Sequence, residues 1–142
     1  MKDDVKDLLK NPNLKLGSDE EFDYDRVPFE IDALDDLLGG GIPKKRITLL
    51  TGPTNVGKSY LASQAVANAQ RAGGTAAWID AELSWDPAWM EKCGIDLENV
   101  LVAQPVTGEE AFNTMRELMD AEVDVIVPVS YTHLTLPTIL LV

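Results

Sequence analysis

Residues 52–59 read Gly52-Pro53-Thr54-Asn55-Val56-Gly57-Lys58-Ser59 and match the pattern G-x-x-x-x-G-K-[ST] at every specified position. An apolar run precedes them, and a stretch with helical composition begins at Lys58. The two glycines allow a tight turn whose backbone N–H groups face a phosphate chain. In this pattern Lys58 reaches the β- and γ-phosphates, and the Ser59 hydroxyl is a ligand for Mg²⁺. The motif therefore predicts a phosphate-binding loop for a nucleoside triphosphate, between a strand and a helix.

Strands and helices alternate around this loop. Short apolar runs predict strands, and the segments between them predict helices that begin near Lys58, Pro87 and Gly108. Alternation at this spacing predicts βαβ units, and therefore an α/β fold with a parallel sheet flanked by helices. The four predicted strands are Ile47–Thr51, Thr75–Ile79, Val100–Ala103 and Val123–Val127.

The composition is that of one soluble domain with an excess of acidic groups. The chain has 142 residues, 24 Asp and Glu against 12 Lys and Arg, and a net charge of −12. This balance argues against a generally basic surface that coats nucleic acid, although it leaves room for a local basic patch. Cys93 is the only cysteine, which excludes an internal disulfide and favours a reducing, cytoplasmic compartment.

Residues 1–26 form an acidic amino-terminal segment. Val5, Leu8 and Leu9 form one apolar stripe there, which predicts a short helix. Such a helix has little to bury by itself, so it is either frayed or docked on another surface. A second helix is predicted over residues 31–38, where three consecutive glycines end it.

Two carboxylates follow the second predicted strand. Asp80 and Glu82 lie at its carboxyl end, and ligands bind at that edge of an open parallel sheet. A hydrolase of this class needs a group that orients or deprotonates the attacking water, and Glu82 is the better candidate. Asp80 is placed to bond to a neighbouring loop. From the spacing alone, solvated loop carboxylates are an equally good interpretation.

Aromatic and acidic side chains continue along the same loop. Trp89 lies in the first turn of a helix that starts with Asp86-Pro87, where its ring is placed to stack on adenine. Asp86 would then lie near the exocyclic amine of the base. The alternative, which the sequence alone favours, is that Asp86 only caps the helix and that Trp85 or Trp89 only packs.

Four stretches together resemble the RecA/RadA family of recombinases. They are IDALDDLLGGGIP at 31–43, RITLLTGPTNVGKS at 46–59, WIDAELSWDPAWMEKCGIDLENVLVAQPVTGEEAF at 78–112 and VDVIV at 123–127. The resemblance implies a partial RecA-like P-loop NTPase core over residues 27–127. It also implies an ATPase that uses ATP and Mg²⁺ and forms filaments on single-stranded DNA. By position, Glu82 matches the family's catalytic glutamate, and Asp86 and Trp89 match its adenine contacts.

Several positions depart from the family pattern. Glu30 and Lys45 stand where relatives commonly have glycine in turns. Val129 stands where the family has an aspartate that supports Mg²⁺ through water. Pro128 removes a backbone donor from what is expected to be a central strand.

No Asp, Glu, Lys or Arg follows Asp124, and the family resemblance ends at Val127. A membrane anchor is disfavoured, because Pro128, Pro137 and several hydroxyl side chains suit a lipid-exposed helix poorly. We interpret residues 128–142 as a non-native tail, of the kind that translated sequencing adapter produces. On this hypothesis the sheet is truncated after its fourth strand, and the DNA-binding loops lie outside the chain.

The resulting prediction is the amino-terminal part of a RecA-type recombinase, acting in homologous recombination and DNA repair. Residues 52–59 bind ATP in this prediction, and Lys58 and Glu82 are the catalytic groups. The expected partners are single-stranded DNA, through regions absent from the chain, and further copies in a filament, without a membrane. Two alternatives stay open: a RecA-fold ATPase of the regulatory KaiC-like or helicase type, and a nucleotide-binding module without turnover.

Overall fold

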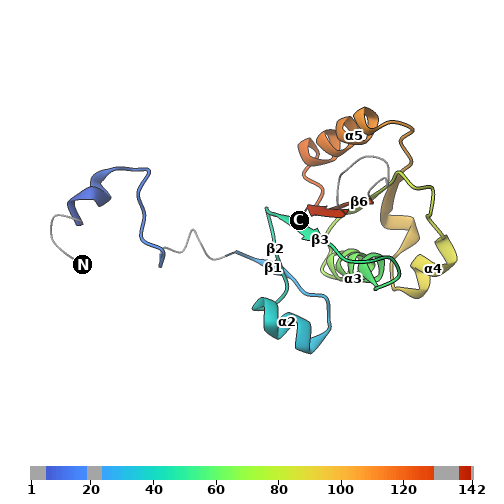
Figure 1. Ribbon diagram of the computed structural model, residues 1–142, viewed down its shortest axis with the longest axis horizontal. Coiled ribbons are helices and arrows are strands. Elements are labelled where there is room, and N and C mark those ends of the chain that lie inside the picture. Colours follow the sequence, from blue (N-terminus) through green and yellow to red (C-terminus); the bar gives the residue numbers. More distant parts are fainter. Residues whose placement is uncertain (1–5, 19–23, 130–137, 142) are drawn as a thin grey trace.

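The computed structural model describes residues 6–18, 24–129 and 138–141. Residues 24–129 and 138–141 form an α/β body, and residues 6–18 lie apart from it (Figure 1). Most of the body is a sheet with helices on both faces, as the alternation of apolar runs and helical segments predicts. Val5 and most of the predicted tail, residues 130–137 and 142, lie outside the described residues.

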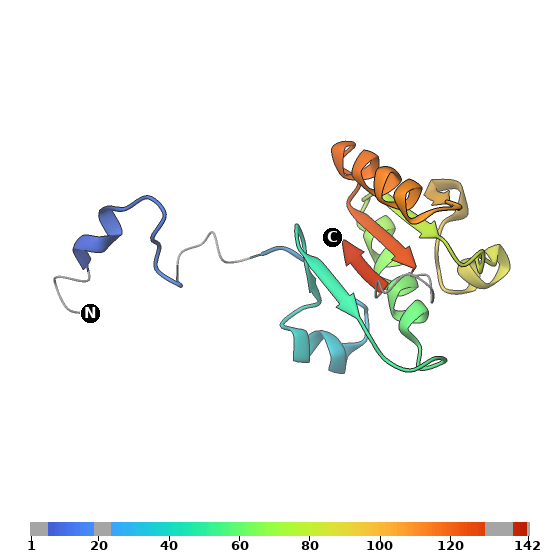
Figure 2. The same cartoon turned by 45° about the horizontal axis from the view of Figure 1, so that its top comes forward.

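Five strands form the main sheet, in the order β3-β7-β6-β4-β5. β4 pairs in parallel with both β5 and β6, while β7 pairs antiparallel with β3 and β6. Because β3 and β6 both oppose β7, they run in the same direction, and Figure 2 shows β3, β4 and β6 pointing to one edge. The strands are β3 (Ile47–Leu50), β4 (Ala76–Asp80), β5 (Val100–Ala103), β6 (Val125–Val129) and β7 (Thr138–Leu141).

β7 corrects the sheet that the sequence predicts. The sheet is neither wholly parallel nor truncated after its fourth strand, because β7 lies between β3 and β6. The sequence of β7, TILL, has high β-propensity and no charge, so it can satisfy the backbone groups that an open strand edge exposes. Among the described residues, β7 pairs with β6 at Ile126, and no pairing with β7 involves Pro128, which lies inside β6.

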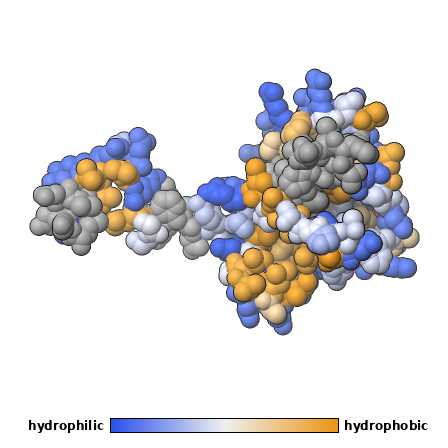
Figure 3. Space-filling view, in the orientation of Figure 1, coloured by the Kyte–Doolittle hydropathy of each residue, from blue (hydrophilic) through white to orange (hydrophobic). Residues whose placement is uncertain are grey.

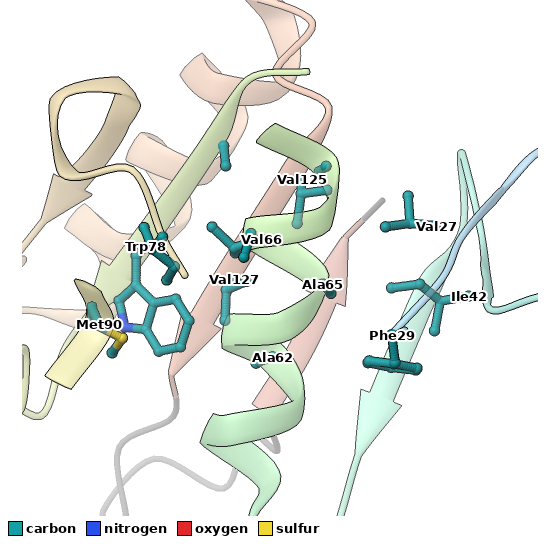
Figure 4. Close-up of a cluster of buried hydrophobic side chains, with 14 residues drawn as sticks. Val27, Phe29, Ile42, Ala62, Ala65, Val66, Trp78, Met90, Val125 and Val127 are labelled. Carbon is teal, nitrogen blue, oxygen red and sulfur yellow. The ribbon is translucent and has the colours of Figure 1, made fainter. Parts of the chain in front are cut away.

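Helix α3 (Lys58–Arg71) covers one face of the sheet, and α5 (Gly108–Asp120) covers the other. The small side chains of Ala62 and Ala65 let α3 lie close to the strands (Figure 4). Trp78, Val125 and Val127 project from β4 and β6 into this contact and are almost fully buried. The main core therefore lies between α3 and the sheet.

A small second sheet covers the outer side of α3. Its strands, β1 (Arg26–Val27) and β2 (Ile42–Pro43), pair antiparallel, and α2 (Asp32–Leu38) lies between them in the chain. Val27, Phe29 and Ile42 are buried against α3 from this side (Figure 4). The sequence predicted α2 but not the two short strands, whose pairing joins residues that are far apart in the chain.

The remaining helices begin where the sequence predicts. α4 (Pro87–Lys92) is capped by Asp86, and α5 begins with a capping box between Thr107 and Glu110. A short 3₁₀ turn, η3 (Leu97–Asn99), precedes β5. The predicted amino-terminal helix is a single 3₁₀ turn, η1 (Asp7–Lys10).

Exposed leucines lie along the amino-terminal segment 6–18. Leu8 is 57 % exposed, and Leu9, Leu14 and Leu16 are exposed as well. Figure 3 shows these apolar patches among charged surface on the part of the chain that lies apart from the body. The helical stripe that the sequence predicts is therefore not buried by residues of the body.

Glu30 and Lys45, which replace the expected glycines, both keep a glycine-like backbone. Their φ angles are 56° and 58°, in the left-handed region. A side chain with a Cβ is strained there by about 1–2 kcal/mol. The turn shapes that glycine would allow are thus retained, at a cost in stability.

Replacing Lys45 with glycine is expected to stabilise the protein by about 1 kcal/mol, because the left-handed backbone then carries no Cβ strain. Lys45→Ala is the matched control, since it removes the same charge but keeps the Cβ and the strain. Urea unfolding followed by circular dichroism measures both. A Lys45→Gly variant no more stable than Lys45→Ala would contradict the strain argument.

Candidate functional site

Three loops leave the sheet at its carboxyl edge. Residues 51–57 follow β3, residues 81–86 follow β4, and Gln104 follows β5. Because β3, β4 and β5 run in the same direction, the loops leave the sheet at one edge (Figure 2). Open α/β sheets bind ligands at this edge, so the fold places the motif and the carboxylates of the second loop on the same side.

The loop Gly52–Ser59 turns directly into α3. Gly57 is the N-cap of α3 with φ 93°, and Asn55 also adopts a positive φ of 61°. A Cβ on Gly52 would lie 3.1 Å from Val56 Cγ2, so a larger residue there would displace the exposed side chain of Val56. The helix has no side-chain cap, and its first bond runs from Leu61 N–H to Gly57 O. The N–H groups of its first turn therefore lack helical acceptors.

Lys58 lies across its own loop. Its Nζ donates to the carbonyl oxygens of Gly52 at 2.9 Å and Pro53 at 2.6 Å, while Ser59 is exposed in the first turn of α3. An ammonium group, uncapped helix N–H groups and a hydroxyl form a donor set that fits an anionic phosphate chain with a hard cation. Within the described residues no group of three or more His, Cys, Asp or Glu side chains could hold a metal.

Asp80 is fully buried at the end of β4 and bonds to the following loop, as the sequence predicts. One carboxylate oxygen accepts from the backbone N–H and hydroxyl of Ser84 at 3.0 and 3.1 Å. The other accepts from the N–H of Trp85 at 2.8 Å and from Gln104 Nε2 at 3.0 Å. Burial raises the pKa of Asp80, but these hydrogen bonds outweigh burial and leave that pKa below its ordinary value.

The other predicted residues of this loop differ in their surroundings. Glu82 is exposed, two residues beyond the end of β4. Asp86 caps α4 by accepting from the N–H groups of Ala88 at 3.0 Å and Trp89 at 3.3 Å. Trp85 packs edge-on against Trp78, with ring centroids 5.7 Å apart. Trp89 is 50 % exposed, so part of its surface is open to solvent.

Two glutamines that sequence reasoning missed join α3 to the region after α4. Gln64 Nε2 donates to the Cys93 carbonyl at 2.9 Å. Gln70 both donates to the carbonyl of Asp96 and accepts from its N–H, each at 2.9 Å. Their only signal in the sequence is their place within an alanine-rich helix. These bonds hold α4 in a defined position relative to the helix that carries Lys58.

The end of β6 differs from the pattern that the resemblance implies. Val129 pairs in register with Asp80 and packs partly buried against the core. Asp124 is no substitute for the carboxylate that the resemblance implies, because it precedes β6 at the opposite edge of the sheet. There Asp124 accepts from the N–H and hydroxyl of Thr75 at 2.8 and 3.0 Å. These bonds fasten the beginning of β4 to the beginning of β6.

An open groove of about 930 Å³ lies away from the glycine-rich loop 52–59. It is lined by residues around the beginnings of β3 and β6, among them Arg46, Ile47, Met119 and Ile126. The beginnings of these strands lie at the edge of the sheet opposite to the three loops. The groove is therefore separate from the candidate site.

The fold and the edge loops define an α/β protein with parallel strands between helices and a glycine-rich loop at their carboxyl edge. The family model for the RecA N-terminal domain matches residues 1–138. The chain belongs to the RecA family. Among the described residues, no helix has the length and apolar character needed to cross a membrane.

Several curated relatives are similar to the chain, and each of them is named Protein RecA. The protein from Acidothermus cellulolyticus is 46 % identical over 120 residues, which cover 83 % of the chain and 35 % of that protein. The protein from Gloeothece citriformis is 42 % identical over 119 residues, covering 83 % and 33 %. The protein from Clavibacter michiganensis is 48 % identical over 103 residues, covering 72 % and 28 %. The chain thus spans about a third of the length of the relatives that it matches.

The lowered pKa of Asp80 predicts acid sensitivity of the fold. A carboxyl whose pKa is lower in the folded state than in the unfolded state stabilises the protein at pH values above the unfolded pKa, which is about 3.9. This contribution is lost as the pH falls through the folded pKa. We expect the free energy of urea unfolding to decrease as the pH is lowered below about 4. In Asp80→Asn this decrease should be less steep. Equal slopes in the two proteins would contradict this role of Asp80.

Proposed function

We propose that the chain is the ATP-binding part of a RecA-type recombinase, with Gly52–Ser59 as the phosphate-binding loop of a P-loop NTPase core. The observation that carries the proposal is the geometry of this loop at the carboxyl edge. Gly57 begins α3 without a side-chain cap, and Lys58 is held over the loop by two carbonyl oxygens. Membership of the RecA family supports a recombinase over a regulatory or helicase-type ATPase of the same fold.

The residues of the loop would each have a distinct part in binding. The N–H groups of the first turn of α3 would donate to phosphate oxygens, and the Lys58 ammonium would exchange its carbonyl partners for the phosphates. The Ser59 hydroxyl would hold Mg²⁺ together with phosphate oxygens, and the ion would neutralise charge that develops on them. Trp89, which is half exposed, would stack on adenine beside Asp86.

Glu82 is the proposed general base. It follows β4 at the same edge as the loop and has no hydrophobic cover, so its carboxylate can meet water. In hydrolysis this carboxylate would orient a water molecule in line with the γ-phosphate and accept its proton. The proton leaves the water as its oxygen bonds to phosphorus, and ADP leaves with the electrons of the broken bond.

Two substitutions test this assignment in the chain itself. Lys58→Ala is expected to weaken Mg·ATP binding about 10- to 100-fold, because a hydrogen bond from a charged group contributes about 1.5–3 kcal/mol. Glu82→Gln is expected to bind Mg·ATP normally and to hydrolyse it about 100-fold more slowly, since it cannot accept a proton. Isothermal titration and single-turnover assays with labelled ATP measure the two effects.

Lys92→Ala and Glu117→Gln are the matched controls, because both side chains are exposed and lie on other helices. They should leave binding and hydrolysis unchanged. A parent chain that does not bind Mg·ATP would defeat the proposal for this chain. A Glu82→Gln variant that hydrolyses ATP at the parent's rate would defeat the role of Glu82 alone.

A nucleotide-binding module without turnover is the second candidate, favoured by one observation. Val129 is apolar and partly buried beside Asp80, where the family resemblance implies a carboxylate that supports Mg²⁺. In the same assays such a module would bind Mg·ATP and lose binding in Lys58→Ala, while showing no hydrolysis. The proposed non-native origin of residues 128–142 would explain why Val129 stands at this position. An independent sequence read of the gene tests that origin.

We also propose self-assembly through the amino-terminal segment, as in the filaments that the family resemblance implies. The exposed leucines of residues 6–18 supply apolar surface that the body does not cover. Single-stranded DNA would bind through parts of the family's fold that lie outside this chain. DNA binding is therefore proposed for the intact protein, since the chain spans about a third of the length of the curated relatives that it matches.

Replacing Leu8 and Leu9 together with serine is expected to weaken self-association at least about tenfold, since each buried leucine contributes about 1.5–3 kcal/mol. Leu37→Ser is the matched control, because Leu37 is 82 % exposed on α2 rather than on the segment. Sedimentation velocity over a range of concentrations measures the association. An equal loss in the control, or a parent that stays monomeric, would contradict the proposal.

A further inference from the structure

The carboxylate of Asp80 is the most completely bonded acidic group at the candidate site. It is fully buried, and its two oxygens accept four hydrogen bonds. Three of the donors belong to Ser84 and Trp85 in the loop after β4, and the fourth is Gln104 after β5. A buried charge is stable only when it is paired or fully hydrogen-bonded, so this set of donors is what permits Asp80 to lie there.

The loop that Asp80 holds contains a strained residue. Leu83 has φ 55°, a left-handed conformation that costs a leucine about 1–2 kcal/mol. Its side chain is 70 % exposed, so packing of the leucine does not compensate for the strain. The bonds from Ser84 and Trp85 to Asp80 follow directly after Leu83 and close the turn around it. These bonds therefore maintain the strained turn.

Glu82 lies between the anchored ends of this turn. On one side, Ala81 is buried directly after Asp80. On the other, Trp85 is fixed both by its N–H bond to Asp80 and by its edge contact with Trp78. The side chain of Glu82 is exposed, so its direction is set by the backbone of the turn rather than by packing.

We propose that Asp80 is a positioning residue, whose carboxylate holds the loop 81–85 so that Glu82 faces the edge where Gly52–Ser59 lies. Gln104 is the partner that joins this loop to the end of β5. The inference rests on the proposed function for the role of Glu82 in hydrolysis. The anchoring of the turn itself rests on the four hydrogen bonds and on the backbone of Leu83.

The chain provides a matched control for Asp80 in Asp124. Both are aspartates that bond to a backbone N–H and a hydroxyl, and both lie at an end of a strand. Asp124 lies at the opposite edge of the sheet from the loops. Asp80→Asn and Asp124→Asn thus make the same chemical change at the two ends of the sheet, and only the first can affect Glu82 through the loop.

Two measurements on the 142-residue chain test the inference. Hydrogen exchange followed by NMR reports the amides of Ser84 and Trp85 directly, without nucleotide. In Asp80→Asn we expect both amides to exchange at least about tenfold faster than in the parent chain, after normalisation to core amides. In Asp124→Asn their exchange rates should be unchanged. Single-turnover hydrolysis should fall at least about tenfold in Asp80→Asn, with a threefold or smaller change in the Kd for Mg·ATP.

Gln104→Ala is a milder second variant, which removes one donor and leaves three. It should shift exchange and hydrolysis in the same direction as Asp80→Asn, and it remains informative if that variant does not fold. The inference is overturned if Ser84 and Trp85 keep their protection, or if hydrolysis falls no more than in Asp124→Asn. It is also overturned if hydrolysis and the Kd change together.

The proposed function can fail separately. A wild-type chain that does not bind Mg·ATP, or that binds it without hydrolysing it, would contradict the proposed ATP hydrolysis at this site. Backbone order parameters of residues 82–85 then decide the anchoring. A drop in Asp80→Asn but not in Asp124→Asn supports Asp80 as the anchor of the turn, and equal order parameters in all three proteins overturn it.

Discussion

The close packing of α3 against β4 and β6 is the contact on which the rest of the structure depends. Ala62 and Ala65 are small enough to bring the helix axis near the strands, and Trp78 fills the remaining space from the sheet. The same helix begins with Lys58, so a core contact fixes where the glycine-rich loop ends. The small β1–β2 sheet packs on the outer side of α3, which leaves the helix enclosed between two layers.

Two aspartates fasten opposite ends of the sheet by similar chemistry. Asp124 joins the beginnings of β4 and β6 through Thr75, and Asp80 joins the ends of β4 and β5 to the following loop. At the first end the result is structural, because no motif residue lies there. At the second the same type of bond shapes a loop that carries an exposed carboxylate. The two aspartates differ in their effect because the strands run in the same direction, so the loops of the candidate site all follow the end at which Asp80 lies.

Local signals were sufficient for most of the secondary structure. The cap at Asp86, the box at Thr107 and the length of α3 follow from residues that are neighbours in the chain, and the structure confirms them. β7 and the β1–β2 pair were missed because their pairing joins distant residues, which no local pattern records. For the candidate site, the sequence singled out Asp80 and Glu82 but not Gln104, since an amide that bonds across two strands has no signature in spacing.

The sequence by itself determined the glycine-rich loop, its flanking strand and helix, and family membership, because each depends on residue types at short, defined separations. Only the tertiary structure decided which carboxylate is buried and which is exposed. Asp80 and Glu82 are two residues apart and chemically alike, yet one accepts four hydrogen bonds and the other meets solvent. That distinction depends on where Ser84, Trp85 and Gln104 lie in space, and it arises from the pairing of β4 with β5 and the turn at Leu83.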